Sequence, residues 1–454
     1  MRQALLEFLR EHGPTPARQV LAALCVSQPT LSRLFAGAGD AIVRVGRARA
    51  TVYAATREVP GAGRSWPVYR IDEQGRPAVA ARLHALAPRS WWYQAEPPSA
   101  SWLHGDYASG IFPGLPWFLD DLRPQGFLGR AFARRHAGDL GLSPDLQRWS
   151  AEDVLRVLTR FGTDLPGDFV IGDLALERFE RAGLEPMQAV AESDRATRYD
   201  ALAAAAIAGE LPGSSAGGEQ PKFTVSVEGS QGLRHLLVKF SPPQGSTTGT
   251  RWTDLLLCEH LAGEVLRENG LAVSKTAWFE SGERGYLEVT RFDRVGARGR
   301  RGFVSLHALE SAYYGYLDDW WSASDRLLAD GWLGASNADS LRVLWWMGRL
   351  IGNTDMHFAN VSVALTPQRP LSLAPAYDML PMHYRPSASG EVTTVPLRLP
   401  IPPPAHRDVA RRAATIAQEF WRRVGADSRI SDSFSVEAAR VGAELVRLID
   451  AVLA

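Results

Sequence analysis

An aspartate and an asparagine stand five residues apart on a polar turn between two apolar runs. Asp355 follows the run 345–351, and Asn360 precedes the strand-like run 361–365. This spacing suits phosphoryl transfer, in which the carboxylate orients an incoming hydroxyl and the asparagine holds a magnesium ion. Asp378 stands where a second metal-binding carboxylate is expected. Asp and Asn are also common turn residues, so the pair taken alone is a weak signal.

A loop of small residues lies upstream, from Gly213 to Gly218, and precedes the alternating strand-like run 222–227. Free backbone N–H groups in such a loop can surround phosphate oxygens. The candidate residues are Ser215, Ala216, Gly217 and Gly218. The loop matches neither Gly-x-Gly-x-x-Gly nor the pattern of P-loop proteins. By motif alone, a flexible turn is therefore the simpler interpretation.

A lysine in the β-rich run 235–240 is the next candidate. Lys239 is one of three lysines among fifty basic residues. A compact ammonium binds phosphate as a point charge, so we expect Lys239 to contact a nucleotide. The helix expected at 252–268 places Glu259 where an ion pair could orient Lys239, although a solvated helix carboxylate fits the pattern equally. The hairpin expected over 278–290 leads to a hinge at Thr290 and Phe292.

The order of these parts is the strongest evidence in the sequence. A glycine-rich loop, a strand lysine, a helix glutamate, a hinge and the Asp355 loop follow one another between residues 213 and 378. This is the order of parts in a kinase-like phosphotransferase that uses ATP and Mg²⁺. His357 lies inside the Asp355 loop. We interpret it as a hydrogen-bonding residue that holds the loop beside ATP, rather than as an acid or base.

The composition is that of a globular protein. At 454 residues, with 45% hydrophobic and 22% charged residues, the chain is long enough for about three domains. Fifty basic and fifty acidic residues cancel, so the overall charge favours no polyanionic partner. Cys25 and Cys258 form no disulfide framework, and we find no signal peptide or membrane-spanning run. These features predict a cytoplasmic protein without a membrane partner.

The first 57 residues have helix-turn-helix spacing. Apolar periodicity predicts helices near 3–12, 16–24 and 28–35, followed by strands at 41–45 and 51–55. This pattern is typical of a winged helix. Eight arginines against three acidic residues give a net charge of +5, which suits contact with DNA phosphates. The candidate DNA-binding residues are Gln28, Thr30, Ser32, Arg33, Arg44, Arg47 and Arg49. Small winged helices also serve as protein-contact modules, and this alternative stays open.

The chain resembles the HipA family of bacterial serine/threonine kinase toxins. The resemblance rests on motifs at 215–222, 238–239, 291–294, 351–360 and 377–378, and it covers roughly residues 205–430. A looser likeness extends over 65–200, where residues 115–126 are similar to the family's N-terminal subdomain. Family members usually work beside a separate DNA-binding antitoxin. Because this chain begins with its own helix-turn-helix segment, it resembles the longer YjjJ-like branch.

The resemblance implies an α/β (α+β) protein with a two-lobed, protein-kinase-like fold, a mainly helical C-lobe and a preceding winged helix-turn-helix domain. The expected domains are a DNA-binding unit at 1–58, a HipA N-terminal-like subdomain at 59–205, the kinase N-lobe at 206–294 and the helical C-lobe at 295–454. The implied partner is a protein substrate with an acceptor serine or threonine. An antitoxin and DNA are further partners that the resemblance leaves open.

The resemblance also implies transfer of the ATP γ-phosphate to protein, by the toxin of a type II toxin–antitoxin system. In the family, a serine just before the glycine-rich loop is autophosphorylated, which shuts off activity. Ser215 matches that position, and Ser214 is its neighbouring alternative. Thr290 departs from the family pattern, in which an acidic residue often precedes the hinge, so the hinge contacts with adenine are expected to differ here.

Two other functions fit the same residues. Aminoglycoside- and choline-type phosphotransferases share the Asp-x4-Asn arrangement, so a small molecule could be the acceptor. A DNA-binding regulator whose kinase-like domain senses nucleotide without catalysis is the second alternative. The glycine-rich loop favours a protein kinase over the first alternative. The complete set of Asp355, Asn360 and Asp378 argues against the second.

Overall fold

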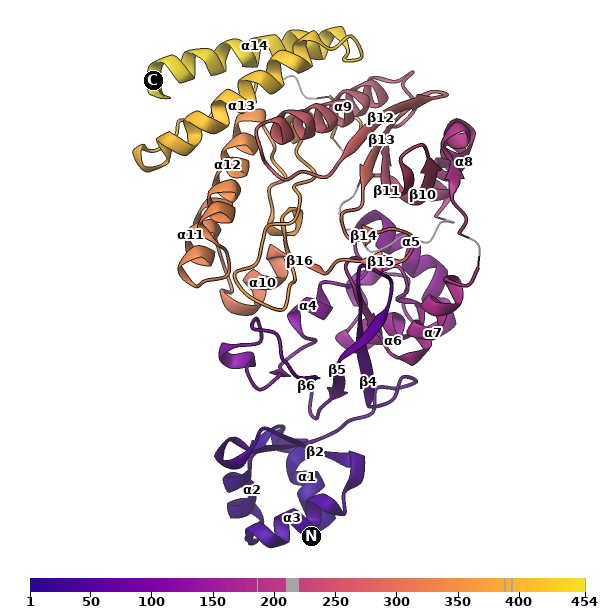
Figure 1. Ribbon diagram of the computed structural model, residues 1–454, viewed down its shortest axis with the longest axis vertical. Helices are drawn as coiled ribbons and strands as arrows, with labels where there is room; N and C mark the ends of the chain where they lie inside the picture. Colours follow the sequence, from indigo (N-terminus) through magenta and orange to yellow (C-terminus); the bar gives the residue numbers. More distant parts are fainter. Residues whose placement is uncertain (186, 210–219, 388, 393–394, 454) are drawn as a thin grey trace.

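The computed structural model describes residues 1–185, 187–209, 220–387, 389–392 and 395–453. Figure 1 shows a small unit with the N-terminus at one end, a middle region, and a larger region that carries the C-terminus. The predicted loop residues Ser214, Ser215, Ala216, Gly217 and Gly218 lie outside the described residues. Within the described ranges, no helix is long and apolar enough to cross a membrane.

The N-terminal unit contains the three helices and two strands that the sequence predicts, together with a short strand, β1, that it does not predict. They are α1 (Arg2–His12), β1 (Thr15–Pro16), α2 (Ala17–Leu24), α3 (Gln28–Ala36), β2 (Ile42–Val45) and β3 (Val52–Ala55). The strands form an antiparallel sheet in the order β1-β3-β2. The Ser27 hydroxyl accepts a hydrogen bond from the Thr30 N–H at 3.4 Å and caps α3. Leu5, Leu9 and Leu31 are completely buried, so the helices share one small core.

The middle region is organised around an antiparallel sheet with the strand order β7-β6-β5-β4-β8. Its strands are β4 (Ser65–Ile71), β5 (Pro77–Ala85), β6 (Trp91–Ala95), β7 (Ile111–Phe112) and β8 (Phe169–Ile171). Its helices are α4 (Trp117–Asp120), α5 (Gly126–His136), α6 (Ala151–Phe161) and α7 (Asp173–Ala182). Trp117 and Phe118 are buried in the same core as Trp91. The aromatic segment that contains α4 therefore has a packing role.

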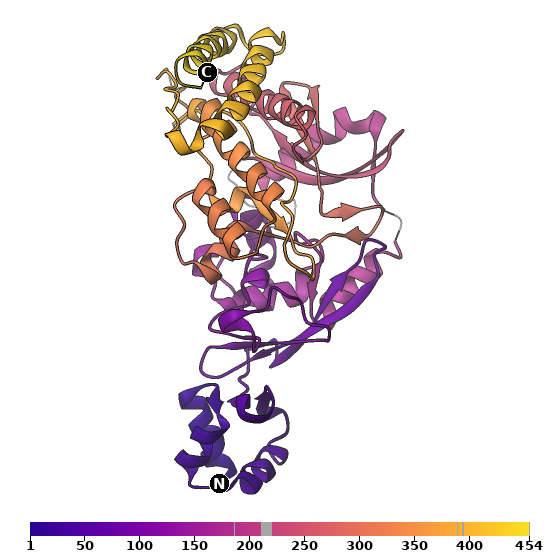
Figure 2. The same ribbon diagram turned by 60° about the vertical axis from the view of Figure 1, so that its left-hand side comes forward.

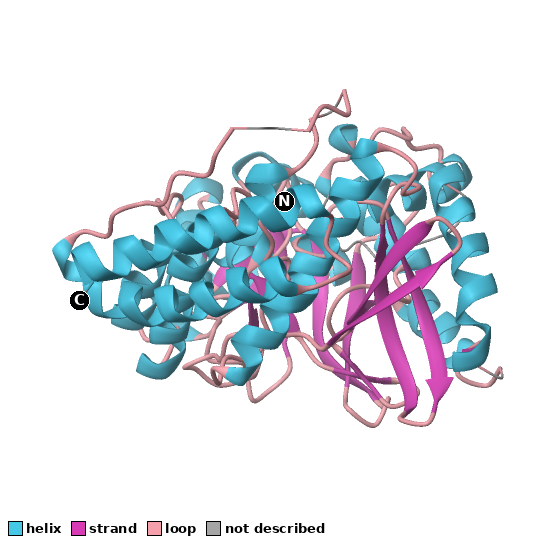
Figure 3. Ribbon diagram, turned by 90° about the horizontal axis from the view of Figure 1, so that it is seen from above, coloured by secondary structure: helices cyan, strands magenta, loops and turns pink. Residues whose placement is uncertain are grey.

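A second sheet, with the order β12-β13-β11-β10-β9, carries Lys239. Its strands are β9 (Val190–Ala191), β10 (Lys222–Gly229), β11 (Gly232–Phe240), β12 (Thr276–Ser281) and β13 (Arg284–Thr290), flanked by α8 (Arg195–Ala208) and α9 (Thr247–Glu268). Figure 3 shows the long strands right of centre, with helices on both sides of them. Tyr199 of α8 packs on Phe223 and Tyr286. The packing of this lobe therefore begins before residue 206, the start expected from the sequence.

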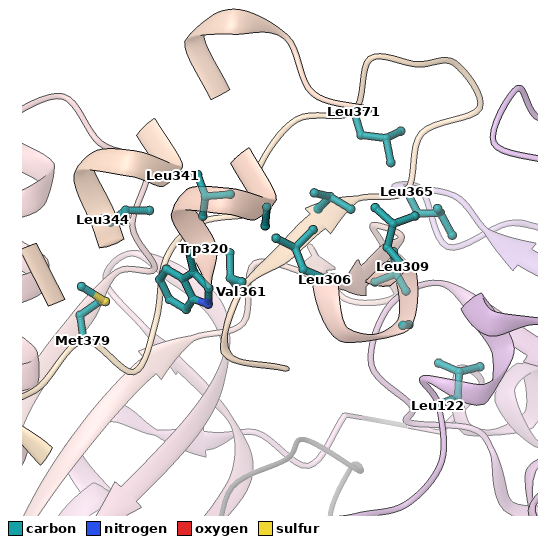
Figure 4. Packing of buried hydrophobic residues seen from close by; sticks show 14 of the residues in the cluster. Leu122, Leu306, Leu309, Trp320, Leu341, Leu344, Val361, Leu365, Leu371 and Met379 are labelled. Carbon is teal, nitrogen blue, oxygen red and sulfur yellow. The ribbon is translucent and has the colours of Figure 1, made fainter. Parts of the chain in front are cut away.

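The last region is mainly helical and follows a small hairpin of β14 (Arg294–Val295) and β15 (Gly299–Arg300). It contains β16 (Phe303–Ser305), α10 (Leu306–Tyr313), α11 (Trp320–Ala329), α12 (Ala335–Ile351), β17 (Ser362–Ala364), α13 (Arg407–Ala426) and α14 (Asp432–Leu448). Figure 2 shows these helices stacked along the long axis. Trp320, Leu341 and Val361 lie together in its core (Figure 4), which continues through Leu122 into the middle region. One hydrophobic core therefore supports both walls of the site described next.

Candidate active site

The ammonium of Lys239 is the buried centre of the site. Lys239 lies on β11, and its Nζ is 2.7 Å from each carboxylate oxygen of Glu259 on α9. The same Nζ donates to Asp378, in the loop after β17. The Lys239 and Glu259 side chains are 3% and 4% exposed, so Glu259 is not a solvated helix carboxylate. The fold brings together three predicted residues that are far apart in sequence.

Charge neutralisation favours the charged forms of Lys239 and Asp378, whereas burial raises the pKa of the Glu259 carboxyl above its ordinary value. Burial by itself lowers the pKa of the Lys239 ammonium, but the carboxylates of Asp378 and Glu259 outweigh it and raise that pKa above its ordinary value. Burial likewise raises the pKa of the Asp378 carboxyl, yet the charges of Lys239 and Lys222 bring it below its ordinary value. The site therefore presents a charged carboxylate beside a fixed ammonium at neutral pH.

A second lysine faces the first across the sheet. Lys222 begins β10 and is the cross-strand partner of Lys239 in the antiparallel register. Opposed residues have Cβ atoms about 4.5–5.5 Å apart, and Lys222 is only 2% exposed. The sequence motifs alone do not assign a role to Lys222, although lysine is rare in this chain. Its rarity, together with the strand alternation after it, was the available signal.

The Asp355 loop begins where α12 ends. Gly352 follows the helix with a φ of 76°, a left-handed conformation that glycine adopts without strain. The Asp355 N–H donates to Asn353 Oδ1 at 3.0 Å. Asn360 Nδ2 donates to the Asp355 carbonyl at 2.8 Å and to its carboxylate at 3.4 Å. These bonds hold Asp355 and Asn360 side by side, with the Asp355 side chain 41% exposed to solvent.

Asp378 is joined to the same loop. Asn353 Nδ2 donates to the Asp378 carbonyl at 3.2 Å. Asp378 has a φ of 56°, in a region that residues other than glycine rarely adopt and that clusters at functional sites. The preceding Tyr377 hydroxyl lies 2.8 Å from the Ser362 hydroxyl on β17. The backbone around Asp378 is thus held from two sides.

A cavity of about 850 Å³ gathers these side chains, a volume within the range typical of cofactor sites. Seven predicted residues line it: Lys239, Thr290, Phe292, Asp355, His357, Asn360 and Asp378. Glu259 does not line the cavity, because it lies behind the Lys239 ammonium. Gln220, Pro221 and Lys222, the described end of the glycine-rich loop, also face it.

The predicted hinge forms one edge of the cavity. The Thr290 N–H donates a hydrogen bond to the Lys275 carbonyl at 2.8 Å. The Phe292 ring stacks near Tyr377, with ring centroids 6.2 Å apart, and meets Phe303 edge-on at 4.9 Å. Phe292 therefore offers a fixed apolar surface next to Asp378. His357 Nε2 lies 3.4 Å from the Asp355 carboxylate, a contact compatible with the loop-holding role predicted for it.

The middle region completes the cavity, which sequence reasoning missed. Asp121, Gln125, Gly126 and Pro166 all line it. The Asp121 carboxylate accepts from the Ser305 N–H at 2.8 Å and from the Ser305 hydroxyl at 2.6 Å, and burial raises the pKa of this carboxyl. Ser305 in turn caps α10. The unusual mixture of aromatic and turn residues at 114–129 was the only sequence signal for this contribution.

The residues predicted to bind DNA lie on the N-terminal unit, away from the cavity. Gln28, Ser32 and Arg33 on α3 are exposed, and Thr30 is partly exposed. Arg44 and Arg47 are also exposed, while the side chain of Arg49 falls outside the described part of the structure. The Arg44 guanidinium lies 6.0 Å from the Phe35 ring centroid. These positions form an exposed polar and basic face, and DNA binding stays a prediction.

The fold defines the class of protein. HipA of Shewanella oneidensis MR-1, solved in a complex with HipB and its operator DNA, aligns with a TM-score of 0.50 over 86% of this chain and 97% of that chain. The two sequences are 15% identical, so this likeness shows the fold alone. The protein therefore has the two-lobed, kinase-like HipA fold, as predicted, while the assignment of the N-terminal unit as a winged helix-turn-helix domain stays a prediction.

Two family models and one relative define the family. The YjjJ-like toxin middle domain matches residues 62–180, and the HipA-like C-terminal domain matches residues 214–438. Toxin YjjJ of Escherichia coli (strain K12) is 38% identical over 423 residues, which cover 93% of this chain and 93% of that protein. The chain belongs to the family of YjjJ-like toxins with a HipA-like C-terminal domain. The resemblance drawn from the sequence motifs is confirmed.

Proposed function

We propose that this protein is an ATP-dependent serine/threonine protein kinase that acts as the toxin of a type II toxin–antitoxin system in the cytoplasm. The observation that carries the proposal is the convergence of Lys239, Asp355 and Asp378 on one cavity of about 850 Å³. Phosphoryl transfer asks mainly for positioning and electrostatic stabilisation, and these three side chains can supply both. Membership in a toxin family supports the biological role.

The nucleotide would bind along the line from the hinge to Lys239. Thr290 and Phe292 border the part of the cavity suited to adenine, and Lys239 with the amides of Ser215, Ala216, Gly217 and Gly218 would hold the phosphates. Glu259 keeps the Lys239 ammonium in place through two hydrogen bonds of 2.7 Å. Lys222 adds a second positive charge at the same end of the cavity.

Asn360 and Asp378 fit a magnesium ion. Both line the cavity, and Asn360 uses its amide nitrogen toward Asp355, which leaves its side-chain oxygen as a ligand. In the described residues, no cluster of three or more His, Cys, Asp or Glu side chains could hold a metal. This agrees with Mg²⁺, which is commonly held by one or two carboxylates together with nucleotide phosphates. When bound, Mg²⁺ would neutralise negative charge on the transferring group.

Asp355 would orient the acceptor hydroxyl and accept its proton. The carboxylate is partly exposed and is held by Asn353 and Asn360, so it meets the acceptor in a fixed position. His357 would steady this loop beside the phosphates. No covalent protein nucleophile is needed. Transfer to Ser215, or to the adjacent Ser214, would be the self-limiting reaction that the HipA resemblance implies.

The test is incubation of the purified protein with Mg²⁺ and labelled ATP, beside the Asp355→Asn variant, with the phosphate mapped by mass spectrometry. We expect label on protein serine or threonine, including Ser215 or Ser214, and none in the variant. The variant should bind ATP as the parent does. Label on an added aminoglycoside or alcohol instead of protein would favour a small-molecule kinase. ATP binding with no transfer to any acceptor would favour a nucleotide-sensing regulator.

We also propose that the N-terminal unit binds DNA, and that an antitoxin restrains the kinase. The exposed positions Arg33, Arg44 and Arg47, with the local net charge of +5, support phosphate contact. The Shewanella HipA was solved with HipB and operator DNA, which supports the same two partners here. A gel shift with the full-length protein tests DNA binding. Removing each arginine should reduce the slope of log affinity against log salt by about one.

A further inference from the structure

Asp355 and His357 lie in the wall between two cavities. On one side is the cavity of about 850 Å³ that contains Lys239, and on the other is a cavity of about 510 Å³. Both cavities include Asp355 and His357 among their lining residues. Resting on the proposed function, this arrangement would let a nucleotide fill the larger cavity while an acceptor hydroxyl reaches Asp355 from the smaller one. We call the smaller cavity the acceptor groove.

An extended segment forms one wall of the acceptor groove. Leu397 is buried and packs so closely on Gly352 that a Cβ at Gly352 would lie 2.9 Å from the Leu397 side chain. The next residue, Arg398, is exposed, and Pro400 continues the wall. His383 also holds this segment, by a contact of 2.8 Å with the Val395 carbonyl. The buried side chain of Leu397 therefore holds the segment in place, and the exposed Arg398 lies beside the Asp355 loop.

The last turn of α12 contributes a second guanidinium to the lining of the groove. Arg349, in the last turn of α12, is exposed and stacks over two rings, 5.2 Å from the centroid of Trp345 and 5.5 Å from that of Trp346. Stacking on aromatic rings holds a guanidinium in place while its N–H groups stay free to bind. Trp345 and Arg349 both line the groove. The Arg349 guanidinium is thus positioned before any ligand arrives.

Neither arginine forms an ion pair with a carboxylate of the described residues, unlike most of the arginines on the helices of this lobe. Arginines that do form ion pairs there include Arg342, Arg412, Arg423 and Arg440. Asp355 is the only carboxylate among the described residues that line the groove. The groove is therefore a site of net positive charge immediately next to the residue proposed to receive the acceptor hydroxyl.

We propose that the acceptor groove binds an extended segment of a protein substrate in which acidic side chains flank the acceptor serine or threonine. The hydroxyl would lie at Asp355, and an aspartate or glutamate on either side would pair with Arg349 or Arg398. Arginine pairs with carboxylates through two parallel N–H bonds, which gives direction as well as attraction. A basic residue in either position would meet an unpaired guanidinium and be repelled. The groove thus selects substrates by charge as well as by the acceptor hydroxyl.

The experiment measures binding of fluorescein-labelled peptides to the full-length protein in Mg-ADP, at low salt. Each peptide has one central serine, flanked by glutamates in one peptide and by lysines in the other. We expect the glutamate peptide to bind at least about tenfold more tightly, with the difference shrinking as salt is added. The Arg349→Glu, Arg398→Glu double variant should reverse this preference. Equal affinity of the parent for both peptides would overturn the proposal.

Arg447→Glu is the matched control, because Arg447 is an exposed arginine on α14 that lines neither cavity. It should keep the parental preference. If circular dichroism shows that the double variant is unfolded, Arg398→Ala replaces it, since this side chain is exposed on an extended segment. That variant should lose about threefold to tenfold in affinity for the glutamate peptide alone, and no loss would overturn the proposal.

The same peptides, tested with Mg-ATP, separate the two proposals. A charge preference in binding without any phosphate transfer would support the groove and contradict the kinase assignment. Transfer to both peptides at equal kcat/KM, together with equal binding, would support the kinase and overturn the groove. Faster transfer to the glutamate peptide, reversed by the double variant, would support both.

Discussion

The side-chain amide of Asn353 donates to the backbone carbonyl of Asp378 at 3.2 Å, while its oxygen accepts the Asp355 N–H at 3.0 Å. A single side chain, 7% exposed, therefore sets the spacing between two loops. One loop carries the residue proposed to orient the acceptor, and the other carries the carboxylate proposed to hold magnesium. Because misplacement by about 1 Å can cost two orders of magnitude in rate, Asn353 is expected to matter although it is not among the residues proposed to hold ATP or magnesium.

Asn353→Ala should lower kcat by about 10²-fold, because both loops lose their common anchor. ATP affinity should change little, since Lys239 and the hinge are untouched. Steady-state kinetics measure the change in kcat, and titration with nucleotide measures the affinity for ATP. Asn353→Asp keeps the acceptor for the Asp355 N–H but loses the donor to Asp378. Its kcat should therefore lie between that of the parent and that of Asn353→Ala. A near-normal kcat in Asn353→Ala would show that the loops hold their spacing without it.

Glu259→Ala should destabilise the fold and weaken ATP binding together. Breaking a buried ion pair by removing one partner costs about 3–5 kcal/mol. The lower part of that range is expected here, because Lys239 keeps its contact with Asp378. Urea unfolding measures the loss in the free energy of unfolding. Glu259→Gln, which retains one hydrogen-bond acceptor, should lose less. Unchanged stability in both variants would mean that groups other than Glu259 neutralise the charge of the Lys239 ammonium.

Ser274→Ala should weaken ATP binding without destabilising the protein. Ser274 is 4% exposed and lines the larger cavity near Val289 and Thr290, and its Oγ has no hydrogen-bond partner among the described residues. A buried polar group without a partner costs about 1–3 kcal/mol, so its removal should be neutral or stabilising. If adenine supplies the missing partner, the Kd for ATP should rise by about fivefold to twentyfold.

Ser90→Ala is the matched control for this prediction. Ser90 Oγ also lacks a partner among the described residues, but Ser90 does not line the cavity. Its replacement should affect thermal stability in the same direction and leave the Kd for ATP unchanged. An unchanged Kd in Ser274→Ala would mean that the nucleotide does not reach this hydroxyl.

Acid should destabilise the protein through the ion pairs at the hinge. Asp164 lies 2.7 Å from Arg294 and 3.1 Å from Arg291, and Asp293 lies 2.9 Å from Arg291. Desolvation, partial for Asp164 and nearly complete for Asp293, raises the pKa of each carboxyl, but the two arginines outweigh it, so the pKa of Asp164 falls to about 2 and that of Asp293 is also lowered. The pKa of an aspartate carboxyl in the unfolded chain is about 4. A carboxyl whose pKa is lower than this in the folded protein stabilises the fold at pH values above about 4.

The stability from these carboxylates is therefore lost as pH falls from about 5 toward 2. The free energy of unfolding, measured by urea titration across this range, should decline with decreasing pH. Asp164→Asn should flatten part of the decline. Asp164 should account for less of the decline in stability than Asp293, because the Asp164 side chain is 55% exposed and solvent screens its ion pairs. An identical slope in parent and variant would assign the acid sensitivity to other groups.

Local signals predicted much of the architecture. The helix expected at 28–35 appears as α3, because Ser27 and Pro29 mark its start and Leu31 faces inward. The strand and helix around Lys239 and Glu259 also appear as β11 and α9. These elements were predictable since apolar periodicity and capping depend on neighbours within a few residues. The start of the lobe around Tyr199 was harder to predict, because packing across a sheet leaves no pattern among neighbouring residues in the sequence.

The sequence by itself determined which chemical groups were available and in which order: a rare strand lysine, a helix glutamate, an Asp-x4-Asn loop and a later aspartate. Only the tertiary structure decided that Lys239 meets Asp378 across 139 residues. It also decided that the middle region closes the larger cavity, and that Arg349 and Arg398 line the smaller cavity together with Asp355. The physical reason is that hydrogen bonds and burial act between neighbours in space. Spacing along the chain reports only contacts within one helix, strand or turn.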